Sequence, residues 1–347
     1  MRTTRINSWM ASLLVVLTVA FLVAVALAPF GEAPWDGIVT LLGGAFGSAR
    51  RISESLVKTC PLLFTGLGVA VAFRTGAFNI GAEGQFLLGA LGAVAVGSHV
   101  AGLPPWVAVA ATLGAAFLAG LVWGGIAGVL KAWRDVPEVI STIMLNFVAV
   151  YWLSALIRGP LRNPTSGLPE SVEIAAVAEL PRLFEKTRVH AGLPIGILLA
   201  VAVYLLMTRT VLGFKMRAVG FNPVASAFAG FHPRLTWAGT LALSGALAGL
   251  GGGIEVCAIT FRVYDNFSPG YGYTAIAVAL LARLHPIGVV LTAFFFGALE
   301  QGAGTLQREL QVPLVMASIV EGLVVILALL LGFHRPGEKR MPEVETV

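Results

Sequence analysis

The sequence predicts an all-α polytopic membrane protein with about ten transmembrane helices and both termini in the cytoplasm. Of its 347 residues, 57% are hydrophobic and 12% are charged, against roughly 25% charged in a soluble domain. The mean hydropathy is +0.87, and a chain of this composition cannot cover a soluble core with a hydrated surface. The net charge of +5 is scattered over the ends of apolar runs and forms no basic face, so we expect no nucleic-acid partner.

The number of crossings follows from the lengths of the apolar runs. A spanning helix needs ~20 mostly apolar residues. Residues 86–130 contain no Asp, Glu, Lys or Arg, and as one helix they would be about 67 Å long, so the chain must fold back at Gly102-Leu103-Pro104-Pro105. The same arithmetic predicts spans over residues 9–30, 56–73, 80–98, 105–130, 138–157, 191–208, 236–258, 268–283, 286–303 and 312–333.

The orientation follows from the positions of Lys and Arg, which are more frequent in the loops that share a side with both termini. Residues 9–30 are predicted to be a retained anchor, because this apolar run exceeds the 7–15 residues usual in a cleaved signal peptide. The domain plan is a single transmembrane domain over residues 1–347. It carries an outer loop over 158–190, a cytoplasmic loop over 209–235 and a cytoplasmic tail over 334–347.

Within the cytoplasmic loop, residues 222–230 have the features of a short exposed helix. Asn222 can cap the helix and Pro223 can start it. Small residues, among them Ala225 and Ser226, then lead to Gly230. Such a smooth helix outside the membrane is either a docking element for a partner or a simple connector, and the composition does not separate these two interpretations.

Polar residues inside the predicted spans are the candidates for a translocation path. Glu138, Thr142 and Asn146 are spaced i, i+4, i+8 and therefore share one helix face, which lines a path or holds helices together. Asn79, Glu83 and Gln85 lie among glycines that favour either a broken helix beside a cavity or tight packing.

Three further carboxylates, Glu255, Glu300 and Glu321, and one glycine ridge complete this survey of the spans. Glu321 stands midway along 312–333 and is interpreted as a proton relay or as an internally hydrogen-bonded acid. Glu255 follows Gly245, Gly249 and Gly253, which recur at every fourth residue and predict a close helix–helix contact.

Several catalytic motifs are absent from the sequence. It holds no G-x-x-x-x-G-K-[S/T] phosphate loop, so we expect no ATP hydrolysis by this chain. It holds neither H-E-x-x-H nor G-x-S-x-G. The five histidines are spread singly. The sequence therefore predicts no enzyme activity of its own, no metal site and no cofactor.

Four segments, in order along the chain, resemble bacterial ABC importer permeases of the branched-chain amino acid and simple sugar class, in its nucleoside-uptake branch. They are residues 74–85 (RTGAFNIGAEGQ), 137–146 (PEVISTIMLN), 217–225 (RAVGFNPVA) and 267–281 (FSPGYGYTAIAVALL). The resemblance extends over roughly residues 40–332. It implies a multi-pass protein of the bacterial plasma (inner) membrane that pairs with a second permease, homologous or identical. It further implies two cytoplasmic ABC ATPase subunits and an extracytoplasmic substrate-binding lipoprotein.

The resemblance assigns ATPase coupling to residues 217–225, and thus to Arg217, Gly220, Asn222, Pro223 and Ala225, with the adjacent Ser226. The predicted function is a permease subunit that forms the translocation path, with nucleosides as the expected cargo. The alternative is a secondary transporter driven by an ion gradient through an intramembrane carboxylate such as Glu321. A third class, a membrane scaffold without transport activity, also stays open at this point.

Overall fold

The computed structural model describes residues 34–310 and Ile319. The chain divides into one unit over 45–301 and a second unit over 1–44 and 302–347. The predicted span 9–30 and the tail 334–347 lie outside the described residues. The predicted span 312–333, which contains Glu321, also lies outside the described residues, apart from Ile319.

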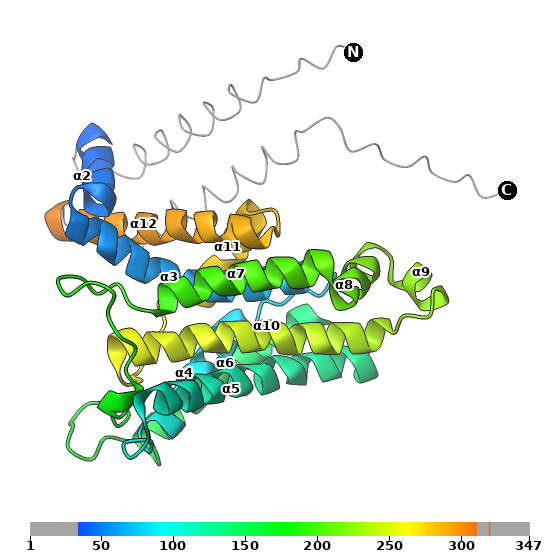
Figure 1. Cartoon of the computed structure of the whole chain (residues 1–347), viewed down its shortest axis with the longest axis horizontal. Helices are drawn as coiled ribbons and strands as arrows, with labels where there is room; N and C mark the ends of the chain where they lie inside the picture. Colours follow the sequence, from blue (N-terminus) through cyan, green and yellow to red (C-terminus); the bar gives the residue numbers. More distant parts are fainter. Residues whose placement is uncertain (1–33, 311–318, 320–347) are drawn as a thin grey trace, which may run out of the picture. The chain divides into compact units, whose positions relative to one another are not determined.

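The regular secondary structure within residues 34–310 is all helical, with three isolated bridges and no β-strand. Figure 1 shows the helices in chain order. Those of the unit 45–301 are α3 (Ala49–Arg74), α4 (Ala82–Gly97), α5 (Pro105–Arg134), α6 (Glu138–Arg158), α7 (Gly192–Arg209), α8 (Val211–Phe221), α9 (Pro223–Phe228), α10 (Pro233–Glu255) and α11 (Tyr271–Leu281). The remaining two, α2 (Pro34–Phe46) and α12 (Pro286–Leu310), each run from one unit into the other.

The predicted spans from 56–73 to 286–303 each coincide with a helix. Within residues 34–310, six helices are long and apolar enough to cross a membrane: α3, α5, α6, α7, α12, and α10 with its π-helical extension Val256–Thr260. The other two, α4 and α11, are apolar but shorter, so each crosses only part of a bilayer. The all-helical, multi-pass architecture is confirmed, whereas the count of ten and the cytoplasmic termini stay predictions.

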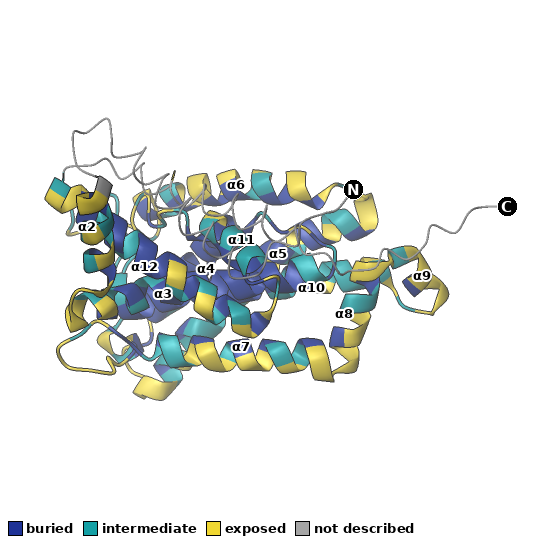
Figure 2. Ribbon diagram, turned by 90° about the horizontal axis from the view of Figure 1, so that it is seen from above, coloured by how far each residue is buried: buried dark blue, intermediate teal, exposed yellow. Residues whose placement is uncertain are grey.

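Close contact between helices in the interior depends on glycine. The central helix α10 packs against α5, α4 and α3. A Cβ added at Gly245 would lie 2.2 Å from the carbonyl oxygen of Gly120 on α5, and one added at Gly89 of α4 would lie 2.1 Å from that of Gly249. The predicted glycine ridge is therefore a packing face on which backbones touch. Figure 2 shows the opposite pattern on α6 and α7, whose outer faces are exposed, as expected for surfaces that meet lipid.

One end of the unit 45–301, called the loop end from this point, is formed by residues 159–191 and 256–270. The first segment contains the 3₁₀-helix Ala176–Ala178. It is bound to the second by backbone hydrogen bonds, Ser171 N–H to the Val263 oxygen (2.8 Å) and Ile174 N–H to the Phe261 oxygen (2.9 Å). The loop is thus fastened to the end of α10.

Acid is expected to weaken the loop end through His190. This side chain is buried, its Nδ1 accepts the Gly192 N–H at 3.2 Å, and its Nε2 has no partner among the described residues. Burial, with a smaller contribution from the Arg188 charge, lowers its pKa from 6.5 to about 4. The unfolded chain therefore binds a proton that the folded chain excludes, and stability falls as the pH drops from about 6.5 to 4.

At 1.36 kcal/mol per pKa unit the loss is on the order of 3 kcal/mol. It is measured as the thermal midpoint of the detergent-solubilised protein against pH, for wild type and His190→Gln. An identical acid slope in the two proteins would contradict the assignment to His190.

Candidate functional site

The chain between α3 and α4 is not helical although it lies inside the helical bundle. Residues 75–81 turn through Gly76, whose φ of +73° suits glycine, and most of them are buried. Backbone N–H and C=O groups without partners are costly at membrane depth. This segment therefore needs hydrogen bonds from neighbouring side chains.

The predicted polar face of α6 supplies these bonds. Glu138 Oε1 accepts the Phe78 N–H at 3.1 Å, and Thr142 Oγ1 accepts the Ile80 N–H at 3.3 Å. Asn146 bonds twice, because its Oδ1 accepts the Gly84 N–H at 2.8 Å and its Nδ2 donates to the Ile80 oxygen at 2.9 Å. The stripe therefore holds the broken segment in place, which favours the helix-holding interpretation, and its place in a translocation path stays a prediction.

We expect Asn146→Leu to destabilise the bundle. Leucine is similar in size but leaves the Gly84 N–H and the Ile80 oxygen without a partner, and each unsatisfied buried group costs about 1–3 kcal/mol. The measurement is thermal unfolding in detergent, with Met144→Leu as the control because this residue of the same helix is exposed. Equal midpoints for the two variants would show that these bonds contribute nothing.

Asn79 and Gln85 join the broken segment to two other helices. Asn79 Nδ2 donates to Gln85 Oε1 and to Ser244 Oγ on α10, each at 2.8 Å, and Gln85 Nε2 donates back to Asn79 Oδ1 at 3.1 Å. Ser244 Oγ in turn donates to the Gly68 oxygen of α3 at 2.7 Å. The chain is non-helical among these glycines, and the two amides join helices in the packed interior.

Glu83 connects the starts of the two short helices. Its Oε2 accepts the Gly272 N–H at 2.7 Å, and a Cβ at Gly272 would lie 2.1 Å from the Glu83 nitrogen, so the N-termini of α4 and α11 abut. A carboxylate is favourable there because helix N-termini carry partial positive charge.

The two short helices leave this junction in opposite directions. The far end of α4 reaches the loop end, where the Gly97 oxygen accepts the Ala175 N–H at 2.8 Å. Beyond the far end of α11, the Leu284 oxygen accepts a bond of 3.2 Å from Arg74 at the end of α3. Their lengths of about 24 and 16 Å add up to the thickness of a bilayer with its headgroups. The junction therefore lies within the membrane.

Glu255 is separate from this network. It is buried at the end of α10, within electrostatic range of Lys58, Glu300 and Arg188. The sequence indicates Glu300 as an acidic candidate but does not place Lys58 in the site, although a lysine inside the predicted span 56–73 is itself a signal.

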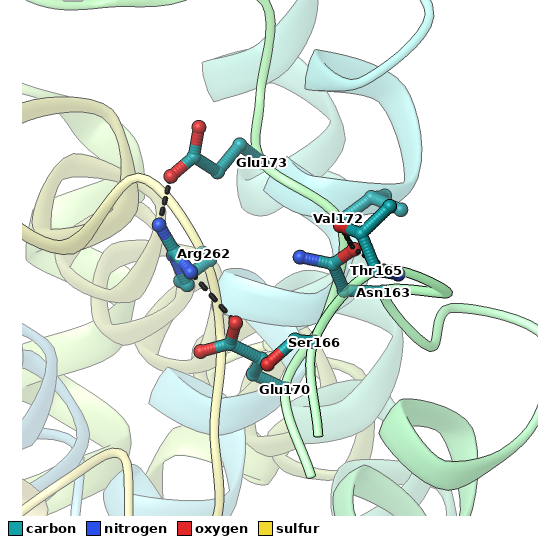
Figure 3. A pocket seen from close by; sticks show the side chains of 7 residues that line it. All are labelled: Asn163, Thr165, Ser166, Glu170, Val172, Glu173 and Arg262. Atoms are coloured by element: carbon teal, nitrogen blue, oxygen red, sulfur yellow. Dashed lines mark hydrogen bonds and ion pairs between the residues drawn. The ribbon is translucent and has the colours of Figure 1, made fainter. Parts of the chain in front are cut away.

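An open cavity of about 580 Å³ lies at the loop end. Figure 3 shows Arg262 between two carboxylates, with a distance of 2.7 Å from its Nη1 to Glu170 Oε1 and a second contact to Glu173. A hydrogen bond from Ser166 and the contact with Arg262 lower the pKa of Glu170. The sequence indicates this region only as part of the outer loop over 158–190.

The opposite end of the unit carries α8 and α9, joined at Asn222. The Asn222 Oδ1 accepts the Ala225 N–H at 2.9 Å, and Pro223 is the first residue of α9, as predicted. The preceding helix α8 was not predicted. Phe221 and Phe228 are each 92% exposed, so this segment, residues 211–228, presents large apolar side chains outward.

The remaining residues of the predicted coupling segment differ in burial. Ala225 is exposed and Ser226 is buried. Arg217 is half-buried, and its Nη1 has no hydrogen-bond partner among the described residues. A Cβ at Gly220 would lie 2.3 Å from the Arg74 oxygen, so Gly220 packs against the end of α3.

Comparison with known proteins decides the family. The family described as branched-chain amino acid transport system / permease component matches residues 51–329. This chain belongs to that family. It is therefore a multi-pass membrane permease that transports and does not itself hydrolyse ATP, and the family works in general with an ATPase and a substrate-binding protein.

Three relatives cover almost the whole permease. The glucose ABC transporter permease protein TsgB13 of Haloferax volcanii is 35% identical over 95% of this chain and 90% of its own length. The guanosine ABC transporter permease protein NupP of Bacillus subtilis is 36% identical over 84% of both chains. The nucleoside ABC transporter permease protein NupB of Lactococcus lactis subsp. cremoris is 31% identical over 91% and 89%.

Proposed function

We propose that this permease is the membrane subunit of an ATP-driven nucleoside importer in a bacterial plasma membrane. The observation that supports this identity of the cargo is the agreement between two relatives. Their names specify guanosine and nucleosides, and their alignments cover 84% and 91% of this chain. The four segments that resemble nucleoside-uptake permeases, residues 74–85, 137–146, 217–225 and 267–281, support the same cargo.

The energy for transport is proposed to arrive through residues 211–228. ATP binding closes the partner ATPases, and their movement is transmitted by α8 and α9 to α7 and α10, which α8 contacts directly. The path then opens alternately to the two sides of the membrane. Arg217, Gly220, Asn222, Pro223, Ala225 and Ser226 are the residues proposed for this coupling segment.

The proposed assembly contains this permease, a second permease, two cytoplasmic ATPase subunits and an extracytoplasmic binding lipoprotein. Its path is proposed to include Asn79, Glu83, Gln85, Glu138, Thr142, Asn146 and Glu255. Glu321 belongs to the same proposal, although its surroundings lie outside the described residues.

The test is uptake by the assembly purified with its partners and reconstituted into liposomes. We expect ATP-dependent accumulation of labelled guanosine and none of labelled glucose. Glucose is the second candidate cargo, because the Haloferax relative is named for glucose. Uptake of glucose without uptake of guanosine would show that the cargo is a sugar and not a nucleoside. Uptake of either compound by this chain alone, driven by an ion gradient and indifferent to ATP, would overturn the proposal in favour of a secondary transporter.

A further inference from the structure

An ion pair joins α3 to α12. Lys58 Nζ lies 2.5 Å from Glu300 Oε1. Lys58 is nine residues beyond Ala49 and so about 14 Å from the loop-end terminus of α3, while Glu300 is about 21 Å along α12 from its start at Pro286. Both charges therefore lie at membrane depth.

The exposure of this pair is unlike that of its neighbours. The side chains of Lys58 and Glu300 are 30% and 21% exposed, whereas Thr59, Cys60 and Leu299 beside them are buried. Charged groups that face hydrocarbon are costly and are found against water or polar partners. The open side of the pair therefore faces an aqueous or polar space.

Further charges extend the pair toward the loop end. Glu54 precedes Lys58 by one helical turn on α3 and bonds to Arg188 at 3.3 Å. Glu255 is buried within electrostatic range of Lys58, Glu300 and Arg188. Charged groups of both signs thus lie between the loop end and the buried Glu255.

An aromatic group lies next to these charges. Tyr264 packs edge-on against Phe267 with ring centroids 5.7 Å apart, and Phe267 lies 5.8 Å from Phe86. Tyr264 is 40% exposed and within electrostatic range of Glu255. A flat aromatic surface beside hydrogen-bonding charges is the combination that recognises a nucleobase with its sugar.

We propose that Lys58, Glu300, Glu255 and Tyr264 form a cargo subsite in the loop-end half of the translocation path, in which the lysine and carboxylates bind ribose hydroxyls and the tyrosine ring stacks on the base. This inference rests on the proposed nucleoside function. When the subsite is empty, the ion pair between Lys58 and Glu300 closes it. When a neutral cargo binds, the two side chains separate and form hydrogen bonds to the cargo instead. The cargo thus passes without leaving an unpaired charge.

The first test is chemical accessibility in the reconstituted assembly during ATP-driven turnover. Glu300→Cys, combined with Lys58→Met to remove the unpaired lysine, is treated with a charged, membrane-impermeant thiol reagent. The two native cysteines, Cys60 and Cys257, are buried, so the wild type gives the baseline. Leu291→Cys on the same helix, where the side chain is 72% exposed, is the control for a lipid-facing position.

We expect the cysteine at position 300 to be modified and the one at 291 to resist, because only position 300 faces an aqueous path. No modification at 300, or equal modification at the two positions, would overturn the subsite.

The second test separates recognition from structure. Tyr264→Ala is expected to lower guanosine uptake at subsaturating cargo by about tenfold, because stacking on an aromatic ring is lost, whereas Tyr264→Phe keeps the ring and the uptake. Equal uptake by the two variants overturns the stacking role. A wild-type assembly that transports no guanosine would instead refute the proposed function, and the two failures are thereby distinguished.

Discussion

Gly245→Ala is expected to destabilise the bundle strongly, although it adds only a single methyl group. The added Cβ would lie 2.2 Å from the carbonyl oxygen of Gly120 and 2.9 Å from the Gly124 Cα. Both are backbone atoms, so no side-chain rotation relieves the contact and α10 must move away from α5. Overpacking of this kind costs about 1–3 kcal/mol or more.

The control is Gly114→Ala on α5, where a Cβ would meet nothing within 4 Å. Alanine in an open helical position is favoured over glycine by roughly 0.5–1 kcal/mol, so this variant should be at least as stable as the wild type. The measurement is the thermal midpoint in detergent together with the fraction eluting as monodisperse protein. If Gly245→Ala matched Gly114→Ala, α10 and α5 could not be in backbone contact.

Ala225→Trp is expected to separate ATP hydrolysis from uptake. Ala225 is exposed on α9, so a tryptophan there projects from the surface and obstructs any partner that docks on it. Guanosine uptake per ATP hydrolysed should fall by at least about tenfold. Both rates are measured on the same reconstituted assembly.

Leu168→Trp is the matched control, because this residue is 67% exposed at the loop end, and it should leave the ratio unchanged. Gly220→Trp is unsuitable for this purpose since Gly220 packs against the Arg74 backbone. A tryptophan there would disturb the fold. An unchanged ratio in Ala225→Trp would contradict a coupling role for α9.

Features with a local cause could be predicted from the sequence. Asn222 and Pro223 mark the start of α9 because capping and the proline φ act within one turn. The polar face of Glu138, Thr142 and Asn146 follows from helical periodicity alone.

What these residues contact could not be predicted, because the partners are distant in the sequence. The polar face of α6 bonds to a non-helical segment some sixty residues earlier, at Phe78 and Ile80. Lys58 and Glu300 are 242 positions apart. Hydropathy likewise extends the predicted span 268–283 beyond the helix Tyr271–Leu281, because Ser268, Pro269 and Gly270 form a turn within an otherwise apolar run.

The central claim is that this permease is moved by a partner through residues 211–228, and a site-specific photocrosslink tests it most directly. A photoreactive amino acid replaces Phe228, which is 92% exposed, in the assembly purified with its partners. Leu168 serves as the position for comparison. We predict a crosslink from position 228 to the ATPase subunit and none from position 168. Crosslinks from position 228 to lipid alone, in an assembly that still transports, would contradict the claim.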